Sequence, residues 1–196
     1  MNIVLSSPPA CYPVDLATVR AQLNIDTEDY DARLAGLIAA ATEWVENYTG
    51  RALITRSYTG YLNWFPSGPG GYVRNYIQLE RPPLISVQDL ISYDDNDNPT
   101  TYPATQYYVD TARTPGRIVL RRGQVWPIPL RLADGIQIDW TAGYGPNPSN
   151  IPETIRLAIQ IMVGMFNEQR GDETDAPACP PAVAALLAPY LFWPAS

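Results

Sequence analysis

Few residue types in this chain could support catalysis. The 196 residues include no histidine and no lysine, and all thirteen basic residues are arginine. These absences exclude Ser-His-Asp and Cys-His nucleophile systems, Schiff-base lysines, the lysine of a phosphate-binding loop and histidine-ligated metal sites. Acid–base chemistry would therefore depend on carboxylates alone.

One possible pair of carboxylates is Asp139 with Glu153. Together with five tryptophans and thirteen tyrosines, they could serve a carbohydrate-binding or carbohydrate-active protein. The sequence does not define the separation between the two carboxyl groups. This function therefore stands as the alternative to a purely structural one, and no catalytic residue is predicted.

The acidic stretch Asp94–Pro99 has oxygen-bearing side chains at the spacing that begins a calcium-binding EF-hand loop. Its sixth position is Pro99 instead of glycine, however, and its twelfth is Thr105 instead of glutamate. Asp and Asn also favour tight turns, so an Asx-rich hairpin loop is the better interpretation. We predict no metal site and no cofactor.

Two further features carry little chemistry. The glycine-rich stretch Pro66–Gly71 lacks the GK[ST] sequence of a phosphate-binding loop, so it is predicted to be a hairpin tip, with the role of residues 67–72 left open. Cys11 and Cys179 lie near opposite ends of the chain without a CxxC spacing, and are predicted to be free thiols.

Basic residues concentrate in one section, where five arginines fall within twenty residues: Arg113, Arg117, Arg121, Arg122 and Arg131. They could face DNA or an acidic neighbour, or they could pair across strands with the protein's own carboxylates. The formal net charge of −7 argues against nucleic-acid binding as the main function, because phosphates need basic surface.

The C-terminal segment is a candidate docking element. Tyr190, Leu191, Phe192 and Trp193 follow the helix-stopping Pro189, whereas chain ends are usually frayed and polar. The acidic stretch before it, from Gly171 to Pro177, would act as a tether. The alternative is that these four side chains fold back onto the subunit's own helices.

Helices are predicted near both ends of the chain. Asp31–Tyr48 has apolar residues at steps of three and four and ends at Gly50, while Glu46 falls on the predicted wet face. Asp15 is a predicted N-cap for a short helix over residues 16–23. Ile151–Phe166 is predicted to be a third, very apolar helix, and a fourth, short helix is predicted from Pro180 to Leu187. The leader of residues 1–12 lacks the basic region of a signal peptide, and no stretch approaches the about 20 apolar residues of a membrane span.

The middle of the chain has a strand-like pattern. Residues 53–62, 76–79, 85–93, 107–110, 117–121 and 135–144 are predicted strands with hairpin-like spacing. The predicted fold class is α+β: a bundle of N- and C-terminal helices with an antiparallel β-rich insertion. The expected divisions are a helical hairpin at 1–51, the insertion at 52–150, and the completing helices with the aromatic tail at 151–196.

The order of short phrases along the chain resembles a known family. They run from Trp44-Val45-Glu46 and Tyr48-Thr49-Gly50-Arg51 through Arg81-Pro82-Pro83-Leu84, Pro115-Gly116-Arg117-Ile118 and Thr141-Ala142-Gly143-Tyr144-Gly145 to Pro189-Tyr190. Together they are similar to the phage head–tail connector proteins, also called adaptor or head-completion proteins, of long-tailed phages and gene transfer agents.

This resemblance implies a structural, non-enzymatic virion protein. It implies a homo-oligomeric ring, with twelvefold symmetry expected, that lies below the portal protein and continues the DNA channel. The implied partners are the portal and the next neck protein, a stopper or tail terminator, with DNA only as passing cargo. The implied location is the neck of a particle assembled in the bacterial cytoplasm. The carbohydrate-binding or carbohydrate-active alternative would belong to the same kind of phage-like particle.

Overall fold

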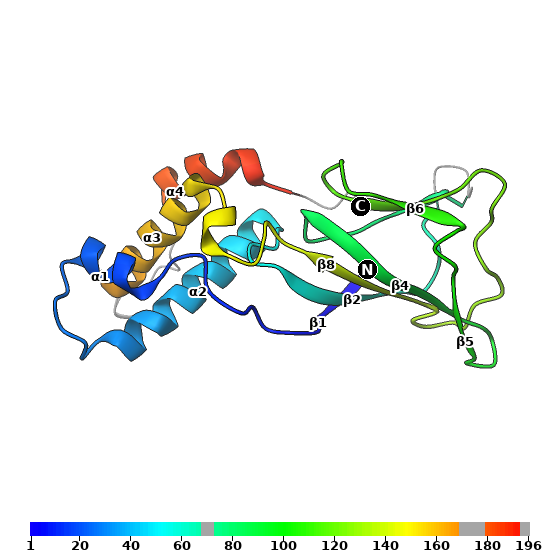
Figure 1. Cartoon of the computed structure of the whole chain (residues 1–196), viewed down its shortest axis with the longest axis horizontal. Helices are drawn as coiled ribbons and strands as arrows, with labels where there is room; N and C mark the ends of the chain where they lie inside the picture. The colour runs from blue at the N-terminus through cyan, green and yellow to red at the C-terminus, as the bar shows by residue number, and fades with distance from the viewer. Residues whose placement is uncertain (68–72, 169–178, 193–196) are drawn as a thin grey trace. The chain divides into compact units, whose positions relative to one another are not determined.

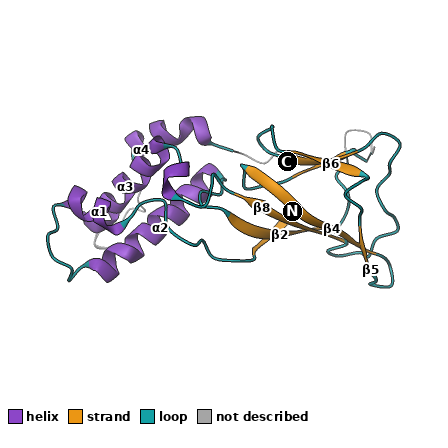
Figure 2. Ribbon diagram, viewed as in Figure 1, coloured by secondary structure: helices purple, strands orange, loops and turns teal. Residues whose placement is uncertain are grey.

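The computed structural model describes residues 1–67, 73–168 and 179–192, and its chain divides into two compact units. The β unit comprises residues 1–8 and 55–143, and the helical unit comprises residues 9–54 and 144–196. Strands lie in the first and helices in the second, so the fold is a mixed α+β fold, as the sequence predicts (Figure 2).

The β unit contains two antiparallel sheets (Figure 1). The larger sheet has the order β1-β2-β8-β4-β5, formed by β1 (Asn2–Leu5), β2 (Arg56–Leu62), β8 (Ile136–Ala142), β4 (Leu84–Tyr93) and β5 (Pro99–Thr101). The smaller has the order β3-β7-β6, formed by β3 (Tyr76–Gln78), β7 (Arg117–Leu120) and β6 (Tyr107–Asp110).

All six predicted strands are present, but β1 and β5 are additional. Residues 2–5 lie in the predicted leader, and they pair with β2 from Asn2 opposite Tyr61 to Leu5 opposite Tyr58. Both added strands have at most four residues and lie at the edges of the sheet, so they show almost no alternation of buried and exposed side chains. Such short edge strands carry no periodic signal in the sequence.

The centre of the large sheet is organised around Trp140, which is fully buried. Its ring stacks on Tyr58 with centroids 5.6 Å apart, and it also covers Gly60. A Cβ atom at Gly60 would lie 2.6 Å from the Trp140 ring. The glycine inside β2 is therefore explained by the close approach of this side chain.

The helical unit contains α1 (Leu16–Leu23), α2 (Asp31–Thr49), α3 (Glu153–Glu168), α4 (Pro181–Leu187) and the short turns η2 (Pro148–Asn150) and η3 (Ala188–Tyr190). A single hydrophobic core takes buried side chains from all four α-helices, among them Val19, Leu34, Ile38, Val45, Ile155, Ile159, Val183 and Leu187. Trp44 is only partly buried against this core and stacks on Tyr48 with centroids 4.9 Å apart.

Polar contacts fix the ends of α1 and α2. The Asp15 carboxylate caps α1 by accepting the Thr18 backbone N–H at 2.7 Å, which confirms the predicted cap. Arg20 donates two hydrogen bonds of 2.7 Å to Asp31 and so ties α1 to the first residue of α2. Gly50 ends α2 with a φ of +68°, a conformation that favours glycine.

The prediction that Glu46 faces solvent is wrong. Its side chain is 7% exposed, and its Oε1 accepts the backbone N–H of Leu53 at 3.0 Å. The chain after α2 turns back over the helix and covers Glu46. The Leu53 N–H then supplies the hydrogen bond that a buried carboxylate needs.

Candidate partner-binding surfaces

Asp139 and Glu153, the two carboxylates considered for catalysis, interact with different partners. Asp139, in β8, accepts hydrogen bonds from Thr59 and Gln137, whereas Glu153, in α3, pairs with Arg156. The two acids belong to different units. Across the described ranges, no group of three or more His, Cys, Asp or Glu residues is placed to hold a metal ion. Cys11 and Cys179 are free thiols, as predicted.

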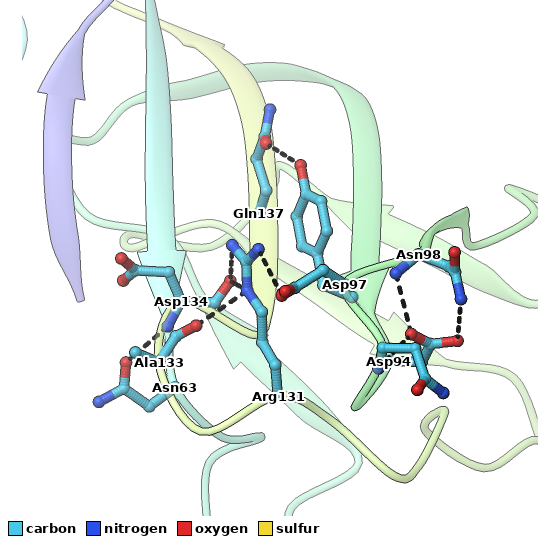
Figure 3. A network of polar contacts seen from close by, with 10 residues as sticks. Asn63, Asp94, Asp97, Asn98, Arg131, Ala133, Asp134 and Gln137 are labelled. Carbon is cyan, nitrogen blue, oxygen red and sulfur yellow. Dashed lines mark hydrogen bonds and ion pairs between the residues drawn. The ribbon is translucent and has the colours of Figure 1, made fainter.

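Asp94 to Asn98 form a hairpin loop between β4 and β5, as the sequence predicts, and Pro99 begins β5. Asp94 accepts the backbone N–H groups of Asn96 and Asn98 and the side-chain amide of Asn98 (Figure 3). The hydrogen bonds from Asn98 lower the pKa of Asp94 below its ordinary value. Its oxygens therefore organise the turn.

Arg131 is the centre of a second network at the same end of the β unit (Figure 3). It donates to the carbonyl oxygens of Ala133 at 2.9 Å and Asp134 at 2.8 Å, and it pairs with Asp97 at 3.4 Å. Its guanidinium lies 3.9 Å from the centroid of the Tyr93 ring. Arg131 therefore holds the 131–135 turn against the β4–β5 hairpin.

The other clustered arginines are partly engaged in the same way. Arg117 pairs with Asp110, directly opposite it in the smaller sheet, at 3.0 Å. Arg121 donates to the Tyr107 carbonyl at 3.2 Å, while Arg113 and Arg122 are exposed. Pairing with the protein's own carboxylates therefore accounts for two of the five arginines, Arg117 and Arg131. Arg113, Arg121 and Arg122 remain exposed as the reduced basic face.

The C-terminal segment lies on the end of α2, in its own helical unit. The Phe192 backbone N–H donates to the Thr49 carbonyl at 2.8 Å, and Arg51 donates to the Tyr190 carbonyl at 2.5 Å. Tyr190, Leu191 and Phe192 are half-buried there, and Trp193 lies outside the described residues. The backbone of this segment thus folds back onto its own subunit, while part of its apolar surface faces solvent.

Tyr144 completes this corner. The guanidinium of Arg51 donates to its hydroxyl at 3.4 Å and also lies 6.0 Å from the centroid of the Tyr190 ring. Burial raises the pKa of Tyr144, with the Arg51 charge opposing that shift. The tyrosine is therefore a neutral hydrogen-bonding partner for the arginine that anchors the C-terminal segment.

The β unit has an apolar pocket that the sequence analysis did not predict. Its cavity volume is about 570 Å³, and its lining is mainly apolar: Trp64, Phe65, Val73, Arg74, Asn75, Leu120, Gln124, Val125, Trp126, Ile128, Pro129 and Leu130. The floor is rigid, because Phe65 stacks on Trp126 at 4.6 Å and Trp126 donates its indole N–H to the Arg74 carbonyl at 2.7 Å.

The pocket's rim is unusually exposed for apolar side chains. Val125 is 78% exposed, Ile128 is 81% exposed and the neighbouring Leu132 is 82% exposed. Clustered exposed apolar side chains around a concave site are typical of surfaces that bind a partner or a ligand. The sequence signal was the apolar run from Val125 to Leu130, which two prolines prevent from forming a strand.

Comparison with known proteins gives a match to one family over part of the chain. Residues 13–101 match the family model described as "Phage gp6-like head-tail connector protein". The resemblance to phage head–tail connectors is thereby confirmed. Head–tail connectors are structural proteins, so the prediction that the chain is not an enzyme is confirmed on the same ground.

Three solved structures share the fold of this chain over its whole length. The "Neck of empty GTA particle computed with C6 symmetry" is 24% identical with a TM-score of 0.80. The "Neck of native GTA particle computed with C12 symmetry" is 25% identical with a TM-score of 0.77, and the "Virion of native gene transfer agent (GTA) particle" is 22% identical with a TM-score of 0.76. Each match covers 100% of this chain and 98% of the other.

No curated protein matches this chain at a significant level. Within the parts of the chain that the structure describes, none of the helices combines the length and apolar character needed to cross a membrane.

Proposed function

We propose that this head–tail connector assembles as a homo-oligomeric ring in the neck of a phage-like particle, where it joins the portal to the next neck protein. The observation that carries the proposal is the connector family match over residues 13–101, within a fold that resembles gene transfer agent neck structures over its full length. The C12 symmetry named for one of those structures supports a twelvefold ring.

In this proposal the helices from the two ends of the chain form the body of each subunit, and the β-rich section between them is an insertion. The shared core of α1 to α4 supports this arrangement. The inferred divisions remain residues 1–51, 52–150 and 151–196, with the first strand, Asn2–Leu5, contributed to the insertion by the N-terminal segment.

The ring would extend the DNA channel below the portal. The formal net charge of −7 suits a channel through which DNA slides, because a surface that neutralised phosphates would retain the DNA. DNA is then a passing cargo and not a bound ligand. A stopper or tail terminator is the inferred partner on the far side, and assembly is inferred to occur in the bacterial cytoplasm.

The C-terminal segment, with Tyr190, Leu191, Phe192 and Trp193, is the proposed contact with the portal. The side chains of Leu191 and Phe192 are half-buried on their own subunit, so apolar surface is left for a partner. Aromatic side chains at the centre of an interface commonly contribute about 2 kcal/mol or more each.

Removing the gene from its host and imaging the particles tests this function. A connector is expected to leave DNA-filled heads without tails, and adding back the full-length chain should restore tailed particles with its density in the neck. Normal tailed particles made without the chain would contradict the proposal.

A further inference from the structure

The apolar pocket of the β unit is open to solvent, and its rim side chains are exposed. We propose that it receives the Asp26–Tyr30 loop of a second copy of this chain. The inference rests on the proposed ring, because it names the contact by which neighbouring subunits would join. This contact between subunits is separate from the portal contact proposed for the C-terminal segment.

The chemistry of the pocket defines what would fit it. Its rim is apolar, with Val73 60% exposed in addition to Val125 and Ile128. Among the described residues of its lining, Arg74 is the only charged one, and its guanidinium lies 5.8 Å from the centroid of the Tyr76 ring. A complementary segment would insert an apolar or aromatic side chain and bring a carboxylate to Arg74.

Charge is divided unequally between the two units. The β unit has eight arginines and eight carboxylate side chains, so it is formally neutral. The helical unit has five arginines and twelve carboxylate side chains, so it carries the entire side-chain charge of −7. An acidic partner for Arg74 is therefore available on the helical unit of another copy.

One segment of the helical unit has both required features. Among its described residues, the large apolar or aromatic side chains that are well exposed are Tyr12, Tyr30 and Leu157. Tyr30 is 50% exposed and follows Asp26, Glu28 and Asp29, all of which are exposed. No comparable run of carboxylates adjoins the other two.

The loop is also held ready for binding. The double hydrogen bond between Arg20 and Asp31 fixes its C-terminal end, and the Asp31 backbone N–H donates to the Glu28 carbonyl at 3.0 Å. Ordering before contact reduces the entropy lost on binding. Because pocket and loop are different surfaces of one chain, their pairing is heterologous and repeats from subunit to subunit, as a ring requires.

Disulfide trapping tests the contact directly. In a Cys11→Ser, Cys179→Ser background, one full-length chain carries Tyr30→Cys and a second, differently tagged chain carries Ile128→Cys. The two are co-produced in the particle-forming host and oxidised. A disulfide-linked heterodimer is expected from particles that contain both chains. Replacing Ile128→Cys by Val4→Cys is the matched control, because Val4 is 49% exposed on β1 of the same unit and does not line the pocket.

The outcomes separate this inference from the proposed function. If both chains enter particles but no heterodimer forms, or if Ile128→Cys joins to a different protein, the pocket contact is overturned and the connector function stands. If neither the unmodified chain nor the variants enter particles, the connector function itself fails.

Charge reversal gives a second, independent readout. Arg74→Glu should lower incorporation into particles roughly tenfold, because it places a like charge opposite the loop's carboxylates. Adding Asp29→Arg to the same chain should restore incorporation, since each subunit then supplies a complementary pair. Arg113→Glu, an exposed arginine outside the pocket lining, should leave incorporation unchanged. Equal effects of Arg74→Glu and Arg113→Glu, or no rescue by Asp29→Arg, would overturn the pairing.

Discussion

The backbone N–H of Phe192 donates a 2.8 Å hydrogen bond to the carbonyl oxygen of Thr49, the last residue of α2. The next residue, Gly50, lies directly beneath this contact: a Cβ atom placed there would be 2.6 Å from the Phe192 carbonyl oxygen. One glycine therefore serves both the left-handed end of α2 and the approach of the C-terminal segment.

Replacing that glycine should displace the C-terminal segment. In Gly50→Ala the φ of +68° is unfavourable for alanine, at a cost of about 1–2 kcal/mol, and the new methyl group collides with the Phe192 carbonyl. We expect lower stability together with faster hydrogen exchange of the Phe192 amide. Gly36→Ala is the control, because no atom lies within 4 Å of its Cβ position inside α2, and it should stabilise by about 0.5–1 kcal/mol. Protection of the Phe192 amide that is unchanged in Gly50→Ala would contradict the contact.

Two truncations should separate folding from docking of the C-terminal segment. Ending the chain after Phe192 keeps the hydrogen bonds from Arg51 and to Thr49, so thermal stability should be unchanged. Ending it after Ala188 removes both, at a net cost of about 0.5–1.5 kcal/mol each. Incorporation into particles should fall in both if Trp193 contacts the portal. Normal incorporation of both truncated chains would move the portal contact elsewhere.

The elements of the helical unit follow from local signals. Asp15 before the first turn of α1 and Gly50 after α2 mark helix ends that the structure places within one residue of the prediction. Contacts with residues beyond the helix are not visible in such local signals. Glu46 is on the polar side of the helical pattern, and only the return of the chain at Leu53 explains its burial.

The apolar pocket shows the same limit more strongly. Its lining comes from three stretches, residues 64–65, 73–75 and 120–130, which become neighbours only through the sheet order β3-β7-β6 and the stacking of Phe65 on Trp126. Periodicity predicts which residues form strands, but the side-by-side placement of irregular segments depends on tertiary packing. The apolar run at Val125–Leu130, interrupted by two prolines, was the available local signal.

The Asp15 cap predicts a pH-dependent contribution to stability. Hydrogen bonds from Thr18 lower the pKa of Asp15 below its ordinary value of 3.8. Because the folded-state pKa is the lower one, the stabilisation is complete above the unfolded-state value of 3.8 and is lost as pH falls through the folded-state pKa. Asp15→Ala should lose about 1 kcal/mol near neutral pH. The difference from the unmodified chain should shrink below pH 3.8, as followed by urea unfolding across pH. Asp15→Asn should retain most of the cap without this pH dependence, and a constant deficit for Asp15→Ala at all pH values would contradict the role of the charge.

Glu46 should matter for stability despite being an acidic residue on a helix. Glu46→Ala removes the acceptor of the buried Leu53 N–H and should destabilise by about 1–3 kcal/mol in urea unfolding. Glu46→Gln keeps an acceptor oxygen and should cost less. Glu43→Ala, one turn earlier and exposed, should change stability by less than about 0.5 kcal/mol. If Glu46→Ala and Glu43→Ala had the same effect, the hydrogen bond to Leu53 would have no role in stability.

Residues of the pocket should differ in their effect on stability: buried residues of the floor should stabilise the fold, whereas exposed residues of the rim should not. Trp126 is 6% exposed, stacks on Phe65 and donates to the Arg74 carbonyl, so Trp126→Ala should cost about 3–5 kcal/mol. Ile128, 81% exposed, contributes little to packing, and Ile128→Asp should change the free energy of unfolding by no more than about 0.5 kcal/mol. Both are measurable by chemical denaturation of the purified chain. Because Ile128→Asp leaves the fold intact, any loss of its incorporation into particles reports on binding. A large loss of stability in Ile128→Asp would instead show that the rim is part of the β unit's core.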